Sequence, residues 1–127
     1  MKAIGFNRPL PVSNPEALLN INLPEPELRP HDILVAVQAV SVNPVDVKVR
    51  AAHTPAAGQY RVLGYDAAGI VQAVGSEVRN FKVGDEVYYA GAINRQGSNA
   101  QLQAVDARIA AKKPRSLDFA QAAALPL

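Results

Sequence analysis

The sequence predicts a mainly β domain, either a barrel or a sandwich, with few and short helices. Several short stretches alternate apolar with polar residues, which is the pattern of strands that bury one face. Gly, Pro, Asn and Asp separate these stretches at short intervals, which leave no room for the helices of repeated βαβ units. Because 49% of the 127 residues are apolar, the chain is able to bury a core of its own.

The amino-terminal half contains three expected strands and one expected helix. The strands cover residues 2–6, 19–23 and 32–42. Apolar residues occupy both faces of the longest strand, which predicts burial on both sides. A helix is expected over residues 44–50, because Pro44 suits the first helical position and Asn43 suits the N-cap.

The carboxyl-terminal half contains further short strands and a final helix. The strands cover residues 67–74, 86–89, 100–105 and 108–111. We expect the helix to begin with Ser116 as its cap and with Asp118 in its first turn, where the helix dipole favours an acid. The chain ends on the apolar residues 125–127, whereas an autonomous domain more often ends on polar ones.

The composition argues against several classes of function. The net charge is only +2 and no basic stripe alternates with aromatic residues, so nucleic acid is not an expected partner. Lys112, Lys113 and Arg115 form the one local basic group, which we interpret as a solvated connector. No apolar run is long enough to span a membrane, and the first residues lack the apolar core of a secretory signal. The absence of cysteine excludes disulfides and thiolate metal sites and is compatible with a cytoplasmic location.

Four segments resemble, in the same order and spacing, the medium-chain dehydrogenase/reductase superfamily. Residues 64–69, Gly-Tyr-Asp-Ala-Ala-Gly, are similar to the Gly-His-Glu-x-x-Gly of its zinc-dependent members. Residues 42–50 resemble the helix-opening segment of its zinc-independent quinone oxidoreductases, and residues 83–88 and 120–127 resemble two further family segments. The resemblance is to the zinc-type alcohol dehydrogenase-like and quinone oxidoreductase branch.

This resemblance implies that residues 1–127 are the amino-terminal catalytic (substrate) domain of an oxidoreductase. Its fold would be the GroES-like one, a partly open β-barrel with short helices. The implied reaction is NAD(P)H-dependent reduction of a small-molecule carbonyl, quinone or enone, and the implied cofactor is NADPH. A Rossmann domain outside these residues would hold most of the cofactor, because no Gly-x-Gly-x-x-Gly follows a strand here. A homo-oligomer of the full-length protein is compatible with the resemblance.

The resemblance also assigns site residues. It places Asn43, Tyr65 and Asp66 in the catalytic site, and Asn43, Pro44 and Asp46 beside the cofactor. Zinc members have Cys at the place of Asn43 and His at the place of Tyr65, so the sequence argues against zinc and predicts no metal ligand. The proton-relay hydroxyl and the relay His of zinc members are also replaced, which points to a quinone or activated alkene as the substrate.

Each assigned residue has a second interpretation. The Asn43 amide could donate to a developing oxyanion, or the side chain could only cap the helix. The Tyr65 hydroxyl could donate a hydrogen bond or a proton, or its ring could simply pack. Asp66 could cap a turn. Asp46 is better suited to accept backbone hydrogen bonds than to titrate in catalysis.

Two other functions stay open. One is a zinc-dependent alcohol dehydrogenase with unrecognised ligands, which metal analysis would detect. The other is a GroES-like binding or assembly module, since the fold also builds co-chaperonin rings. A ring would elute far above the monomer mass of 13.5 kDa in size-exclusion chromatography.

We expect residues 1–127 alone to fold but to oxidise no NADPH, because the sequence contains no phosphate-binding glycine loop. The measurement is the loss of NADPH absorbance with a quinone or an enone. Appreciable turnover by the isolated chain would contradict this expectation.

Overall fold

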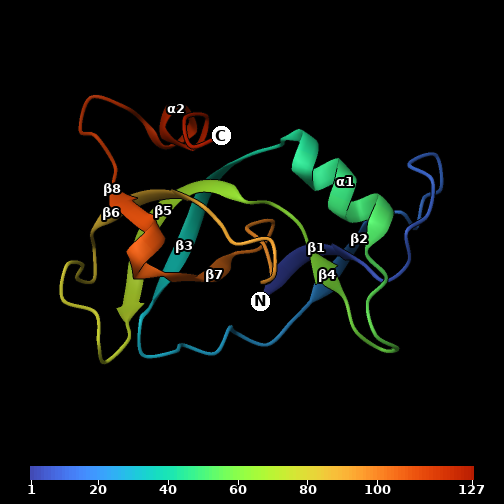
Figure 1. The fold of residues 1–127 in the computed structure, drawn as a ribbon, viewed down its shortest axis with the longest axis horizontal. Helices are drawn as coiled ribbons and strands as arrows, with labels where there is room; N and C mark the ends of the chain where they lie inside the picture. Colours follow the sequence, from blue (N-terminus) through green and yellow to red (C-terminus); the bar gives the residue numbers. More distant parts are fainter.

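A computed structural model describes all residues from 1 to 127 as two antiparallel sheets with two short helices (Figure 1). The smaller sheet has the strand order β2-β1-β4, and the larger has the order β7-β3-β5-β6-β8. A bridge between Ala3 and Ala100, with a hydrogen bond from Ile4 N to Asn99 O of 2.8 Å, links the two sheets. The sheets do not close on each other, so the predicted mainly β, partly open fold is confirmed.

The elements agree closely with the expected ones. The strands are β1 (Lys2–Phe6), β2 (Leu19–Asn22), β3 (Asp32–Ser41), β4 (Arg61–Val62), β5 (Asp66–Val74), β6 (Glu86–Ala90), β7 (Leu102–Asp106) and β8 (Ala110–Lys112). The helices are α1 (Pro44–Ala52) and α2 (Phe119–Ala123), with a 3₁₀ turn over Ala107–Ile109. The 3₁₀ turn replaces the first part of the strand expected over residues 108–111, because the Asp106 side chain accepts a hydrogen bond from Arg108 N.

The main core lies on one face of the five-stranded sheet. Ile33 and Val35 of β3 are completely buried there, together with Val71 and Val87. The opposite face of β3 is less covered than expected, since Leu34 and Ala36 are only half-buried there. Only the short α2 packs on that face, where its alanines meet Ala68. The prediction of burial on both faces of β3 is therefore wrong for the part that α2 does not reach.

The carboxyl-terminal helix begins later than expected. Asp118, not Ser116, is the N-cap of α2, and its carboxylate accepts a hydrogen bond from Gln121 N at 2.7 Å. Gln121 Oε1 in turn accepts from Asp118 N at 3.0 Å, which completes a capping box. Figure 1 shows α2 and the carboxyl terminus at the same end of the sheets as the start of α1.

Lys113 is not part of a solvated connector. Its side chain is only 6% exposed, its ammonium lies 3.2 Å from the Glu86 carboxylate, and it stands 5.3 Å from the centre of the Phe119 ring. The ammonium also donates a hydrogen bond to Leu117 O. Lys113 therefore anchors the segment that leads from β8 to α2.

Gly69 allows β5 to lie close to β3. A Cβ on Gly69 would come within 2.3 Å of Ala36 O and 2.6 Å of Val35 Cγ1. We expect Gly69→Ala to lower the free energy of unfolding by about 1–3 kcal/mol, because the backbone oxygen cannot move away. Urea unfolding measures it, with Gln72→Ala at an exposed position of β5 as the control. A Gly69→Ala protein as stable as that control would contradict the close approach.

Candidate active site

Asp46 joins the start of α1 to the segment that leads into β5. Its side chain is buried, with a residue exposure of 5%. Oδ2 accepts a hydrogen bond of 2.8 Å from Asn43 N, and Oδ1 accepts one of 2.8 Å from Gly64 N. Asp46 thus accepts backbone hydrogen bonds, as its sequence position suggested. Its contact with a cofactor stays a prediction.

Asn43 presents an unpaired donor at the amino terminus of α1. Asn43 is the N-cap of α1 and forms a capping box with Asp46, whose carboxylate accepts a hydrogen bond from Asn43 N. Its Nδ2 is buried and has no partner. An unpaired buried donor costs about 1–3 kcal/mol, and helix capping, which uses the amide oxygen, leaves this donor without a partner. Pro44, the first residue of α1, is exposed, and its contact with a cofactor also stays a prediction.

Tyr65 is 3% exposed and its hydroxyl oxygen accepts a hydrogen bond of 3.1 Å from Arg61 Nη2. The same guanidinium donates to Ile93 O in the loop after β6. The sequence reasoning missed Arg61. The available signal was a single cation directly before the apolar residues 62–63, at a position where burial would require polar partners.

Asp66 holds the carboxyl-terminal segment. It is 2% exposed, and its Oδ2 accepts a hydrogen bond of 2.8 Å from Leu127 N. A second link is the hydrogen bond of 2.6 Å from Ser41 Oγ to Ala123 O. The carboxylate therefore orders a distant segment rather than capping a local turn. A catalytic role for Asp66 stays a prediction.

The residues at the zinc-ligand places of the resembled family do not form a zinc donor set. Zinc sites use thiolate, imidazole and carboxylate ligands, whereas these places hold the amide of Asn43, the phenol of Tyr65 and the carboxylate of Asp66. The phenol and the carboxylate are already hydrogen-bonded. No group of three or more His, Cys, Asp or Glu is arranged to hold a metal ion. Both histidines are exposed.

A cavity lies beside these residues. Its volume is about 510 Å³, and its lining comes from the segment after β2, the loop between α1 and β4, and the loop before β7. Arg61 lines it, but Asn43, Tyr65 and Asp66 do not.

Neither helix has the length and apolar character needed to cross a membrane.

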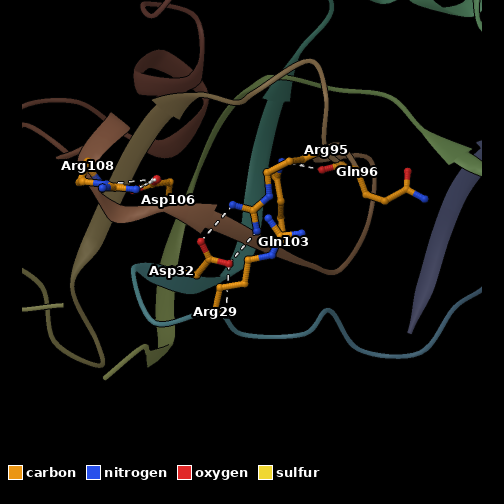
Figure 2. Close-up of polar contacts among 7 residues, drawn as sticks. All are labelled: Arg29, Asp32, Arg95, Gln96, Gln103, Asp106 and Arg108. Atoms are coloured by element: carbon orange, nitrogen blue, oxygen red, sulfur yellow. Dashed lines mark hydrogen bonds and ion pairs between the residues drawn. The ribbon is translucent and has the colours of Figure 1, made fainter. Parts of the chain in front are cut away.

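An ion pair at the cavity wall fastens the loop over residues 91–99. Figure 2 shows Arg95 reaching down to Asp32, the first residue of β3. Its guanidinium bonds both carboxylate oxygens, at 3.0 and 2.6 Å, and Asp32 is 2% exposed. These hydrogen bonds raise the pKa of Arg95 above its usual value, so the arginine stays charged. The ion pair ties the loop to the larger sheet.

Three buried side-chain polar atoms have no hydrogen-bond partner: Asn43 Nδ2, Arg61 Nε and Ser98 Oγ. All three belong to residues around Gly64 and Tyr65. The backbone N–H groups of Asn43 and Gly64 donate to the same carboxylate, that of Asp46. Arg61 bonds Tyr65, and Ser98 Oγ lies 2.4 Å from where a Cβ of Gly64 would stand. Because unpaired buried groups are few in folded proteins and gather at sites with a role, we place the candidate active site here.

The comparisons with known proteins agree on one family. The model of the alcohol dehydrogenase GroES-like domain matches residues 29–115. A zinc-type alcohol dehydrogenase-like protein of Staphylococcus epidermidis is 41% identical over the whole chain, and the chain spans 37% of its length. The NADPH-dependent alkenal/one oxidoreductase, chloroplastic, of Arabidopsis thaliana is 42% identical over 118 residues, which are 86% of this chain and 30% of that protein.

Two solved structures have the same fold. A candidate zinc-dependent alcohol dehydrogenase of Rhizobium etli CFN 42 has a TM-score of 0.96 and 57% identity, and the match covers 100% of this chain and 37% of that one. The quinone oxidoreductase of Coxiella burnetii has a TM-score of 0.85 and 32% identity, over 99% of this chain and 41% of that one.

Replacing Asp46 tests the link between α1 and β5. We expect Asp46→Ala to lower the free energy of unfolding by about 2–4 kcal/mol, because one buried and one part-buried backbone N–H group lose a charged acceptor. The matched control is Asp118→Ala, which removes only an exposed helix cap and is expected to cost about 1 kcal/mol. Equal losses in the two variants, measured by urea unfolding, would contradict the bridging role.

Proposed function

The chain belongs to the alcohol dehydrogenase GroES-like domain family, and we propose that it is the substrate domain of an NADPH-dependent oxidoreductase that reduces quinones or activated alkenes without zinc. The observation that carries this proposal is the unpaired, buried Nδ2 of Asn43 at the amino terminus of α1. A Rossmann domain outside these residues completes the proposed enzyme.

The Asn43 amide can stabilise the negative charge that such a reaction creates. A bound nicotinamide supplies a hydride. When the hydride adds to a quinone or to an alkene conjugated with a carbonyl, negative charge develops on the carbonyl oxygen. A neutral N–H donor that is already in place stabilises this oxygen without reorganisation. The amino terminus of α1 adds a favourable field for negative charge.

The Tyr65 hydroxyl is the second donor in the proposal. Arginine has no acceptor atom, so Arg61 can only donate to the phenol oxygen. The proton of the phenol therefore points to another acceptor. In the proposed reaction that acceptor is the oxygen that gains charge. Asp46 holds Gly64 N, directly before Tyr65, and Asp66, directly after it, holds Leu127 N.

Two relatives support this class of substrate. The Arabidopsis protein is by name an NADPH-dependent alkenal/one oxidoreductase, and the Coxiella protein is a quinone oxidoreductase. The donor atoms at the zinc places, an amide and a phenol, support a reaction that relies on hydrogen bonds to polarise the substrate oxygen.

A zinc-dependent alcohol dehydrogenase is the second candidate. The names of the Staphylococcus and Rhizobium relatives favour it. In this chain, however, a zinc ion would need ligands beyond the residues at the expected places, and no suitable cluster is present.

NADPH oxidation by the full-length protein separates the two candidates. We expect turnover with quinones or enones that survives exhaustive chelation, because the proposed donors are an amide and a phenol. Activity with aldehydes alone, lost on chelation and restored by zinc, would contradict the proposal.

Replacing the amide of Asn43 tests its role as an oxyanion donor. In the full-length protein, we expect Asn43→Ala to lower kcat about 10- to 1000-fold, because the developing charge loses a preorganised hydrogen bond. The control is Asn80→Ala at an exposed position of the loop between β5 and β6. An unchanged rate for Asn43→Ala would mean that Asn43 has only a structural role.

A further inference from the structure

Arg61 occupies a position that stability alone does not explain. It lies in β4, a strand of two residues at the edge of the small sheet, and its side chain is half-buried. Its Nε is buried without a partner. An apolar side chain would avoid this unpaired group. The guanidinium is therefore present for the two contacts that its Nη2 makes.

Those contacts link Tyr65 to the loop that runs beside it. Arg61 Nη2 donates to the Tyr65 hydroxyl oxygen at 3.1 Å and also to Ile93 O. The two segments are joined further by backbone hydrogen bonds of 2.6 Å from Gly91 N to Tyr65 O and 2.8 Å from Ser98 N to Gly64 O. The Arg61 guanidinium thus joins the Tyr65 hydroxyl to a loop that backbone hydrogen bonds already hold in place.

The loop itself cannot move freely away. Arg95, two residues after Ile93, forms the ion pair with Asp32 at the start of β3 (Figure 2). Gln96 Oε1 accepts a hydrogen bond of 2.7 Å from Val62 N, next to Arg61. The Ile93 carbonyl, the second partner of Arg61, is therefore anchored on both sides, by Gly91 before it and by Arg95 and Gln96 after it. This gives the guanidinium a fixed place from which to orient the phenol.

We propose that Arg61 is a positioning residue that orients the Tyr65 hydroxyl as a donor toward the substrate oxygen. The proposal rests on the proposed function for the role of Tyr65. Because a guanidinium only donates, its hydrogen bond occupies a lone pair of the phenol oxygen and leaves the phenol proton for the substrate. Arg61 acts through Tyr65 and touches no substrate in this scheme.

A double-mutant cycle in the full-length protein tests this proposal. The variants are Arg61→Met, Tyr65→Phe, the double variant and the conservative Arg61→Lys. The matched control is Arg79→Met, because Arg79 is exposed and bonds only carbonyls of its own turn. Three quantities are measured. The first two are kcat and the KM for NADPH, with a quinone as the substrate. The third is the ¹³C resonance of the Tyr65 ring carbon Cζ in tyrosine-labelled protein, which senses hydrogen bonds to the attached oxygen.

We expect Arg61→Met to lower kcat about 10- to 100-fold while KM for NADPH stays unchanged, because the donor is misplaced but the cofactor is not. In the Tyr65→Phe background the same change should cost less than about twofold. Arg61→Lys should recover most of the activity. The Cζ resonance should move in Arg61→Met and not in Arg79→Met.

An equal loss of kcat with and without the Tyr65 hydroxyl would overturn the proposal, as would an unmoved Cζ resonance in Arg61→Met. If Arg61→Met does not fold, Arg61→Gln supplies the same comparison, because its shorter side chain keeps a polar group but loses the hydrogen bond to the Tyr65 hydroxyl. A wild-type protein that reduces no quinone or enone would refute the proposed function. The Tyr65 Cζ resonance then decides by itself whether Arg61 positions the hydroxyl.

Discussion

The arrangement of the site depends on one buried carboxylate. Asp46 accepts hydrogen bonds from Asn43 N and Gly64 N, two backbone groups that lie far apart in the chain. It thereby sets the start of α1 beside the segment that carries Tyr65. Gly64 has a φ of +97°, which favours glycine, and a side chain there would collide with Ser98. The carboxylate and this glycine together bring two elements close enough to share one site.

Around this link, the domain combines a well-paired frame with a poorly paired centre. The frame consists of the β3–β5 pairing, the Asp32–Arg95 ion pair and the Asp66 bond to Leu127. The centre contains all three buried side-chain atoms without partners. Such groups reduce stability, so a frame with strong pairing is needed to keep them in place. These unpaired groups mark the candidate site.

Local signals in the sequence were enough for most strands and for the start of α1. Pro44 and the polar residues around it fix that start, and the acceptor role of Asp46 follows from its place in the first turn. Long-range contacts decided the rest. β4 is too short to show alternation, Lys113 is buried only because Glu86 and Phe119 meet it, and the role of Arg61 depends on a loop distant in sequence. No local pattern encodes such contacts.

The central claim is that the unpaired amide of Asn43 donates a hydrogen bond to the substrate oxygen on which negative charge develops. The most direct measurement is a crystal structure of the full-length protein with NADP⁺ and an enone, which cannot react with each other. The expected result is the enone carbonyl oxygen within hydrogen-bond distance of Asn43 Nδ2, with the reacting carbon facing the nicotinamide. An oxygen held by other groups, with Nδ2 bonded inside the protein, would contradict the claim.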